Sequence, residues 1–97
     1  MVISIEPGFY KAGDYGMRIE NLVFVEEDGT RTTSQREFYR FRNLTLCPVS
    51  RKLVDKSLMT AGEVSLLDSY HRSVWNKLYP HLGQEQASWL QRATLPL

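Results

Sequence analysis

The sequence has few of the features that define several large classes of protein. Its single cysteine, Cys47, rules out a disulfide within the chain, and we expect this thiol to be a small buried hydrophobe. No apolar run approaches the length of a membrane span, and the N-terminus lacks the basic and apolar stretches of a signal peptide. We therefore expect a cytoplasmic protein with no membrane segment.

Neither sign of charge dominates the chain. Its 12 basic and 11 acidic residues give a formal net charge of +1, whereas nucleic-acid binders present strongly basic surfaces. We therefore expect no nucleic-acid partner. The 97 residues include 42% hydrophobic and 11% aromatic side chains, which is enough apolar material for one modest core.

The first half of the chain predicts strands separated by turns. Residues before the Pro7-Gly8 turn signal are rich in β-branched side chains, and Asp28-Gly29 closes a second apolar run. A third run, of alternating aromatic and basic residues followed by apolar ones, ends at Pro48. We expect strands at residues 1–6, 17–27 and 37–47, and loops at residues 7–16 and 30–36.

The second half predicts helices. Thr60-Ala61-Gly62-Glu63 matches a capping box, so a helix should begin there and continue until Pro80. It carries one apolar stripe: Val64, Leu67, Tyr70, His71, Val74 and Leu78. We expect an irregular segment at residues 48–59, a second helix at residues 85–93, and Trp75 and Trp89 as core or interface anchors. A His within such a stripe is more often a packing or hydrogen-bonding residue than a catalytic one.

Strand alternation places Glu6, Arg18 and Glu20 on one side of a predicted pair of strands, opposite its apolar face. Two carboxylates beside a guanidinium are most often a solvated ion pair. The same groups can also help to hold a pair of divalent cations, which prefer hard oxygen ligands. Two carboxylates cannot enclose two ions, so a metal site here would need ligands from elsewhere. The pattern alone leaves both interpretations open.

Two segments carry a resemblance to a known family. Ser4-Ile5-Glu6-Pro7-Gly8-Phe9-Tyr10 and Gly16-Met17-Arg18-Ile19-Glu20-Asn21-Leu22 resemble the pita-bread metallopeptidases, and within them aminopeptidase P. The similarity continues to the end of the chain, through Leu44–Pro48, Leu53–Asp55, Leu58–Thr60, Tyr70-His71, Trp89-Leu90 and Thr94–Leu97. The resemblance implies an α+β fold, with strands of the catalytic domain at residues 1–48 and a helical C-terminal extension at residues 49–97.

The resemblance also implies a function. Family members are dinuclear-metal hydrolases that remove an N-terminal residue preceding proline, so the substrates would be peptides with proline at the second position. Glu6 and Glu20 match two of the family's ligands for a pair of Mn²⁺ ions, and Arg18 matches an Arg that supports those ligands. The family's two Asp ligands, its ligand His and its other catalytic His lie upstream of the matched segment. We therefore expect a C-terminal portion that is inactive by itself, whether it arises from an internal start, a truncation or a split gene.

Other functions stay open at this point. Arg42 stands where the family has an acidic residue, and with Arg36, Arg40 and the neighbouring aromatics it forms a pattern that also occurs on single-strand nucleic-acid surfaces. Alternating charge on a short strand is more often an exposed edge that resists aggregation. The chain could also be a non-catalytic interaction module, or a homodimer joined through the apolar stripe of its long helix.

Overall fold

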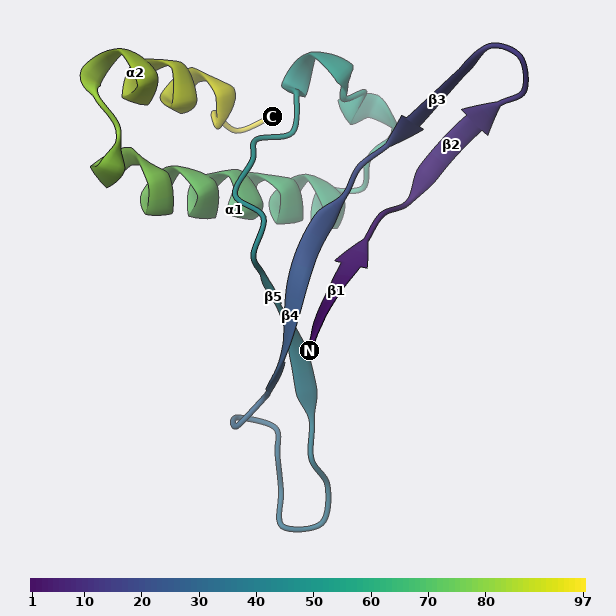
Figure 1. Ribbon diagram of the computed structural model, residues 1–97, viewed down its shortest axis with the longest axis vertical. Coiled ribbons are helices and arrows are strands. Elements are labelled where there is room, and N and C mark those ends of the chain that lie inside the picture. Colours follow the sequence, from purple (N-terminus) through teal and green to yellow (C-terminus); the bar gives the residue numbers. More distant parts are fainter. The chain divides into compact units, whose positions relative to one another are not determined.

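The computed structural model describes residues 1–97, and the chain divides into two compact units. Unit 1, Met1–Thr45, contains every strand, and unit 2, Leu46–Leu97, contains every helix (Figure 1). This arrangement of antiparallel strands followed by helices confirms the predicted α+β class. The predicted division of a larger fold after residue 48 stays a prediction.

Unit 1 consists of two antiparallel sheets. A three-stranded sheet has the order β1-β4-β5, and a two-stranded sheet pairs β2 with β3. The strands are β1 (Val2–Ile5), β2 (Gly8–Lys11), β3 (Tyr15–Arg18), β4 (Asn21–Glu27) and β5 (Tyr39–Asn43). The predicted third strand is thus shorter than expected, and residues 30–36 lie outside the strands, as predicted.

The prediction of a loop at residues 7–16 was wrong, because this segment belongs to the β2–β3 hairpin. One register runs through both sheets: Ile5 lies opposite Asn21 in the first and Gly8 opposite Arg18 in the second. Pro7 separates β1 from β2 because it has no N–H to give to the ladder. Its carbonyl still accepts a hydrogen bond from the Ile19 N–H at 3.2 Å, so the interruption is local.

Unit 2 contains two α-helices and three short 3₁₀ turns. The 3₁₀ turns are η1 (Arg51–Leu53), η2 (Lys56–Leu58) and η3 (Tyr79–His81), and the helices are α1 (Ala61–Leu78) and α2 (Gln84–Ala93). The capping box at the start of α1 is confirmed, since the Thr60 hydroxyl accepts from the Glu63 N–H at 3.2 Å and Glu63 accepts from the Thr60 N–H at 2.8 Å. After η3 the chain turns back, and α2 runs alongside α1 (Figure 1). None of the helices is long and apolar enough to cross a membrane.

The apolar stripe of α1 faces the interior of unit 2. Val74 and His71 have no exposed surface, and Leu90 of α2 is 2% exposed. Trp89, one residue earlier on α2, is 58% exposed, so it is not part of the core, and its alternative role as an interface anchor stays a prediction. The helix places Leu90 inward, and the adjacent position then points outward.

Two neighbouring residues of α1 hold the start of unit 2 in place. The Tyr70 hydroxyl donates to the Cys47 carbonyl at 2.8 Å and accepts from the Cys47 N–H at 3.3 Å. His71 Nε2 accepts from the Val49 N–H at 3.0 Å. His71 is therefore a packing and hydrogen-bonding residue, as predicted. Cys47 itself is exposed, against expectation, because the backbone of this segment rather than its side chains is held by α1.

Candidate metal-ligand site

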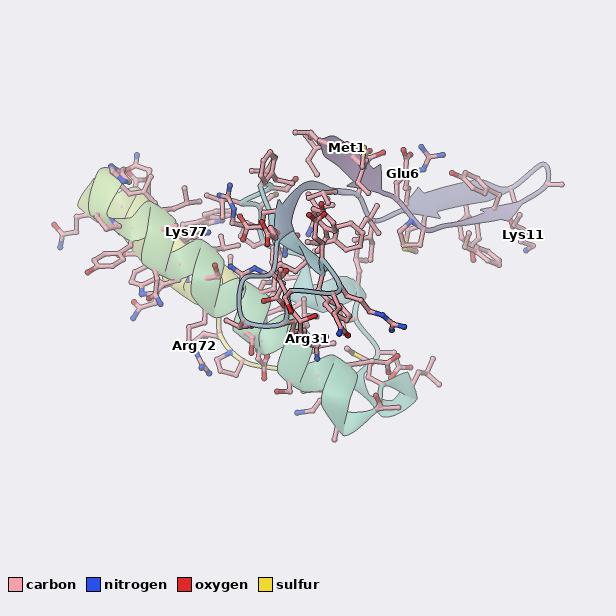
Figure 2. The ribbon with its side chains drawn as sticks, turned by 90° about the horizontal axis from the view of Figure 1, so that it is seen from below. Met1, Glu6, Lys11, Arg31, Arg72 and Lys77 are labelled. Atoms are coloured by element: carbon pink, nitrogen blue, oxygen red, sulfur yellow. The ribbon has the colours of Figure 1, made fainter.

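Glu6 and Glu20 occupy the junction between the two sheets of unit 1, where Figure 2 marks Glu6. The register on either side of the junction places them directly opposite each other. The Val25 N–H donates to the Met1 carbonyl and the Ile19 N–H to the Pro7 carbonyl, so Glu6 and Glu20 fall in a pair that exchanges no hydrogen bond. Side chains approach each other most closely at such pairs. The backbone therefore brings the two carboxylates to one face.

Arg18 lies on the same face, at the strand position diagonal to Glu6, and its role in supporting metal ligands stays a prediction. Its Nη1 forms an ion pair with Glu6 Oε2 at 2.5 Å. The Ser4 hydroxyl donates to the other carboxylate oxygen, Oε1, at 2.7 Å. Both oxygens of Glu6 are therefore held in place by hydrogen-bond donors. Glu20 belongs to none of the ion pairs of the chain, so its charge is not compensated within it.

Tyr10 is a further member of the site that we did not predict. Its hydroxyl accepts from both Nε and Nη2 of Arg18, at 3.0 and 2.5 Å. The ring covers two glycines: a Cβ added to Gly16 would lie 2.7 Å from Tyr10 Cδ1, and one added to Gly8 would lie 2.9 Å from its hydroxyl. The two glycines thus leave room for the ring that fixes Arg18. The signal in the sequence was Gly8-x-Tyr10 opposite Gly16, which becomes visible only when residues 7–16 are paired as a hairpin.

The site suits a divalent cation but is incomplete. The carboxyl groups of Glu6 and Glu20 offer hard oxygen donors, and each oxygen of Glu6 keeps lone-pair capacity beyond its one donor. No group of three or more His, Cys, Asp or Glu side chains in the chain could hold a metal ion. The residues present therefore fit part of a ligand set, and the remaining ligands would have to come from another polypeptide segment.

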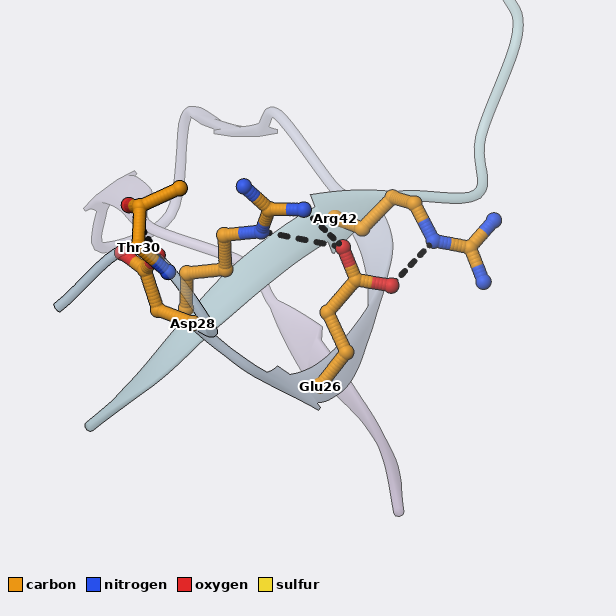
Figure 3. Close-up of polar contacts among 5 residues, drawn as sticks. Glu26, Asp28, Thr30 and Arg42 are labelled. Atoms are coloured by element: carbon orange, nitrogen blue, oxygen red, sulfur yellow. Dashed lines mark hydrogen bonds and ion pairs between the residues drawn. The ribbon is translucent and has the colours of Figure 1, made fainter. Parts of the chain in front are cut away.

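A second charged cluster in unit 1 explains the basic strand β5. Glu26 Oε1 accepts from Arg40 and its Oε2 from Arg42, at 3.0 and 2.8 Å (Figure 3). The Arg42 hydrogen bond, with a further contribution from Arg40, lowers the pKa of Glu26 below its ordinary value of 4.5. Tyr39 and Phe41 alternate with the two arginines and so lie on the other face of the strand. Both arginines are paired with Glu26, and Tyr39 and Phe41 lie away from them, so β5 does not present free cations interleaved with its own aromatic rings as a nucleic-acid surface does.

These features define a class of protein: an α+β fold in which paired strands bring two carboxylates and an arginine to one face. The sequence model of a family described as the C-terminal region of peptidase_M24 matches residues 37–97. Since this match covers more than half of the chain, the chain belongs to that family, as the resemblance implied.

Curated relatives extend the similarity to the whole chain. The chain is 39% identical over 100 residues to a "Probable Xaa-Pro aminopeptidase P" of Coprinopsis cinerea, which covers 100% of the chain and 16% of that protein. It is 39% identical over 102 residues to "Xaa-Pro aminopeptidase ApepP" of Drosophila melanogaster, which covers 100% of the chain and 17% of that protein. The chain therefore spans about a sixth of the length of these relatives.

A solved structure shares the fold. The X-prolyl aminopeptidase from Caenorhabditis elegans matches with a TM-score of 0.85 and 35% identity, over 99% of this chain and 16% of that one. That protein is described as a cytosolic enzyme with a di-nuclear active site. The match confirms the predicted arrangement of antiparallel strands followed by helices.

Proposed function

We propose that this chain is the C-terminal portion of an Xaa-Pro aminopeptidase, a hydrolase that cleaves the bond between an N-terminal residue and a following proline. The observation that carries the proposal is the placement of Glu6 opposite Glu20, with Arg18 on Glu6. The names of the relatives supply the reaction, and the described di-nuclear site of the Caenorhabditis elegans enzyme supplies the metal requirement. As in that cytosolic enzyme, we propose a cytoplasmic location.

Glu6 and Glu20 would hold part of a pair of Mn²⁺ ions in the complete protein. Bound metal ions would act as Lewis acids and would lower the pKa of a bound water, which makes a hydroxide nucleophile available at neutral pH. The residues of this chain would orient the carboxylate of Glu6. Arg18 and Ser4 contact the two oxygens of Glu6 and fix their positions, and Tyr10 fixes Arg18 from the other side. In metal sites such supporting contacts commonly change metal affinity about 10- to 100-fold.

The chain by itself is proposed to be inactive, because Glu6 and Glu20 have no further ligand group beside them. Its partner in catalysis would be a polypeptide equivalent to the remaining length of the relatives. The complete site would act on peptides with proline at the second position.

A chimera tests this proposal. The C-terminal segment of the Caenorhabditis elegans enzyme that matches this chain would be replaced by residues 1–97, and cleavage of an Xaa-Pro peptide would be measured with Mn²⁺ present. We expect cleavage by the chimera, and a loss of at least about 100-fold in the Glu6→Gln and Glu20→Gln chimeras, since each removes a proposed ligand. Glu27→Gln, a change of the same type at an exposed position of β4, is the matched control and should keep the activity.

Two outcomes would contradict the proposal: a folded chimera without activity, or equal activity in the Glu6→Gln and Glu27→Gln chimeras. The first would favour the alternative of a non-catalytic interaction module. Joining of two copies through the α1 stripe also stays a prediction. Part of that stripe is already covered by its own chain, because Val74 has no exposed surface and Leu67, Tyr70 and Leu78 are half-buried. Sedimentation of the chain as a monomer at micromolar concentration would contradict it.

A further inference from the structure

Unit 2 contains an open cleft that the proposed peptidase site does not use. Its volume is about 660 Å³, within the range of roughly 300–1,000 Å³ typical of ligand sites. It lies between the segment that leads into η1 and the C-terminal half of α2. The lining residues are Cys47, Pro48, Val49, Ser50, Arg51, Lys52, Trp89, Arg92 and Ala93.

The charge of this lining is one-sided. Arg51, Lys52 and Arg92 are cations, and no Asp or Glu lines the cleft. None of the three takes part in an ion pair of the chain. Their positive charge is therefore not neutralised by a carboxylate in contact with it, unlike that of Arg18, Arg40 and Arg42 in unit 1.

Arg51 is held in a fixed position in the cleft by hydrogen bonds. Its Nη2 donates to the Pro96 carbonyl at 2.8 Å and its Nη1 to the Arg92 carbonyl at 3.5 Å, while its Nε is buried with no hydrogen-bond partner. These neutral carbonyls tie η1 to the end of α2 without cancelling the charge. A half-buried guanidinium that is held in place but not neutralised attracts an anion more strongly than a mobile surface lysine does.

Apolar surface accompanies the charge. Trp89 and Arg92 are three residues apart on α2 and so share one face of the helix. Trp89 is 58% exposed, although the next residue, Leu90, is buried. The indole therefore leaves a large apolar surface in contact with water. Pro48, Val49 and Ala93 add further apolar lining. Exposed Trp beside Arg is a combination enriched where proteins bind other proteins.

We propose that this cleft is a docking site for an acidic peptide segment, with carboxylates bound by Arg51, Lys52 and Arg92 and an apolar side chain packed on Trp89. The three cations of the lining favour an anionic ligand. The apolar residues beside them favour a peptide, which carries both carboxylates and apolar side chains, over a nucleic acid. A nucleic-acid strand would need a longer basic track and successive stacking rings, whereas the cleft has three cations and one exposed indole.

The test uses the 97-residue chain and a fluorescein-labelled peptide of sequence Glu-Glu-Phe-Glu-Leu-Glu, followed by fluorescence anisotropy at low salt. We expect saturable binding that weakens as salt is added and is absent for the peptide with Gln in place of every Glu. Arg92→Gln and Lys52→Gln should each weaken binding about three- to fivefold, the effect of one exposed charge contact. Trp89→Ala should weaken it further, through lost apolar contact.

Lys77→Gln is the matched control, because Lys77 is an exposed cation of α1 outside the cleft, and it should leave binding unchanged (Figure 2). Folding of each variant is checked by circular dichroism, and Arg51 is left intact because it also supports the fold. Equal binding of the Gln peptide, equal loss in Lys77→Gln, or tighter binding of a single-stranded oligonucleotide than of the acidic peptide would overturn the proposal.

Discussion

The two units of the chain maintain their structure in different ways. Unit 2 buries Val74, Leu90 and His71 almost completely, whereas unit 1 buries only Val23 among its apolar side chains. The β2–β3 hairpin, which carries Tyr10 and Arg18, leaves Phe9 57% and Met17 48% exposed. An isolated two-stranded hairpin is at best marginally stable in water. The comparison teaches that the proposed metal ligands lie in unit 1, which has the smaller core of its own and is held largely by the hydrogen bonds between its strands.

The largest expected effect comes from removing core volume in unit 2. Leu90→Ala should lower the free energy of unfolding by roughly 2–5 kcal/mol, because it leaves a cavity at a position that is 2% exposed. Tryptophan fluorescence follows unit 2 alone, since both tryptophans lie in it. Leu66→Ala removes the same atoms at a position of α1 that is 72% exposed and should change stability by less than about 0.5 kcal/mol. Equal effects would mean that unit 2 has no defined core.

A second test uses pH and His71. Burial lowers the pKa of His71 below its ordinary value of 6.5, with Arg51 acting in the same direction and Asp68 opposing it. The folded state therefore binds fewer protons than the unfolded state, so unit 2 keeps its full stability above about pH 6.5 and loses it as the pH falls below that value. Protonation of Nε2 would also remove the acceptor for the Val49 N–H.

His71→Gln is the control for this test, because Gln can still accept the Val49 hydrogen bond but does not titrate. We expect urea titrations followed by tryptophan fluorescence to show a fall in stability between pH 7 and pH 5 for the natural chain and a smaller fall for His71→Gln. Identical pH profiles would contradict the account of His71.

A smaller effect is expected at the start of α1. Thr60→Ala removes the acceptor of the Glu63 N–H and should cost about 1 kcal/mol in the stability of unit 2. Thr60→Ser keeps a hydroxyl at the same place and should restore most of the loss. No difference between Ala and Ser at position 60 would show that the capping box does not limit the stability of unit 2.

The smallest effect is expected at the Glu26 cluster of unit 1. Arg42→Gln removes one of the two partners of a half-buried carboxylate, so the pKa of Glu26 should rise toward 4.5. The stabilising contribution of Glu26, present above pH 4.5 and lost as the pH falls, should shrink accordingly. NMR titration of the Glu26 side chain measures this directly, with Arg31→Gln as a control that contacts no oxygen of Glu26. An unchanged pKa of Glu26 in the Arg42→Gln variant would contradict the hydrogen bond between Arg42 and Glu26.

The sequence predicted features that depend on short-range chemistry. Thr60 and Glu63 are three residues apart and satisfy each other's backbone groups, and the stripe that contains Val74 follows the helical period. The common face of Glu6 and Arg18 followed from strand alternation once two strands were assumed to pair. These features require only local geometry, so they are readable without tertiary structure.

Features that depend on tertiary contacts were missed. The glycine-rich segment at residues 7–16 has the composition of a loop, but pairing along a continuous register turns it into the hairpin that carries Tyr10. Cys47 sits in an apolar run, yet Tyr70, more than twenty positions away, holds its backbone and leaves its thiol outside. Local composition contains no information about such partners.

Manganese binding tests the central claim most directly. Calorimetric titration with Mn²⁺ would be carried out on the 97-residue chain, on the chimera with the Caenorhabditis elegans enzyme, and on the Glu20→Gln chimera. We predict weak or no binding by the chain alone, tight binding of two ions by the chimera, and binding weakened by at least about tenfold in the Glu20→Gln chimera. Tight binding by the chain alone, or unchanged binding in the Glu20→Gln chimera, would contradict the assignment of Glu6 and Glu20 as part of a shared metal site.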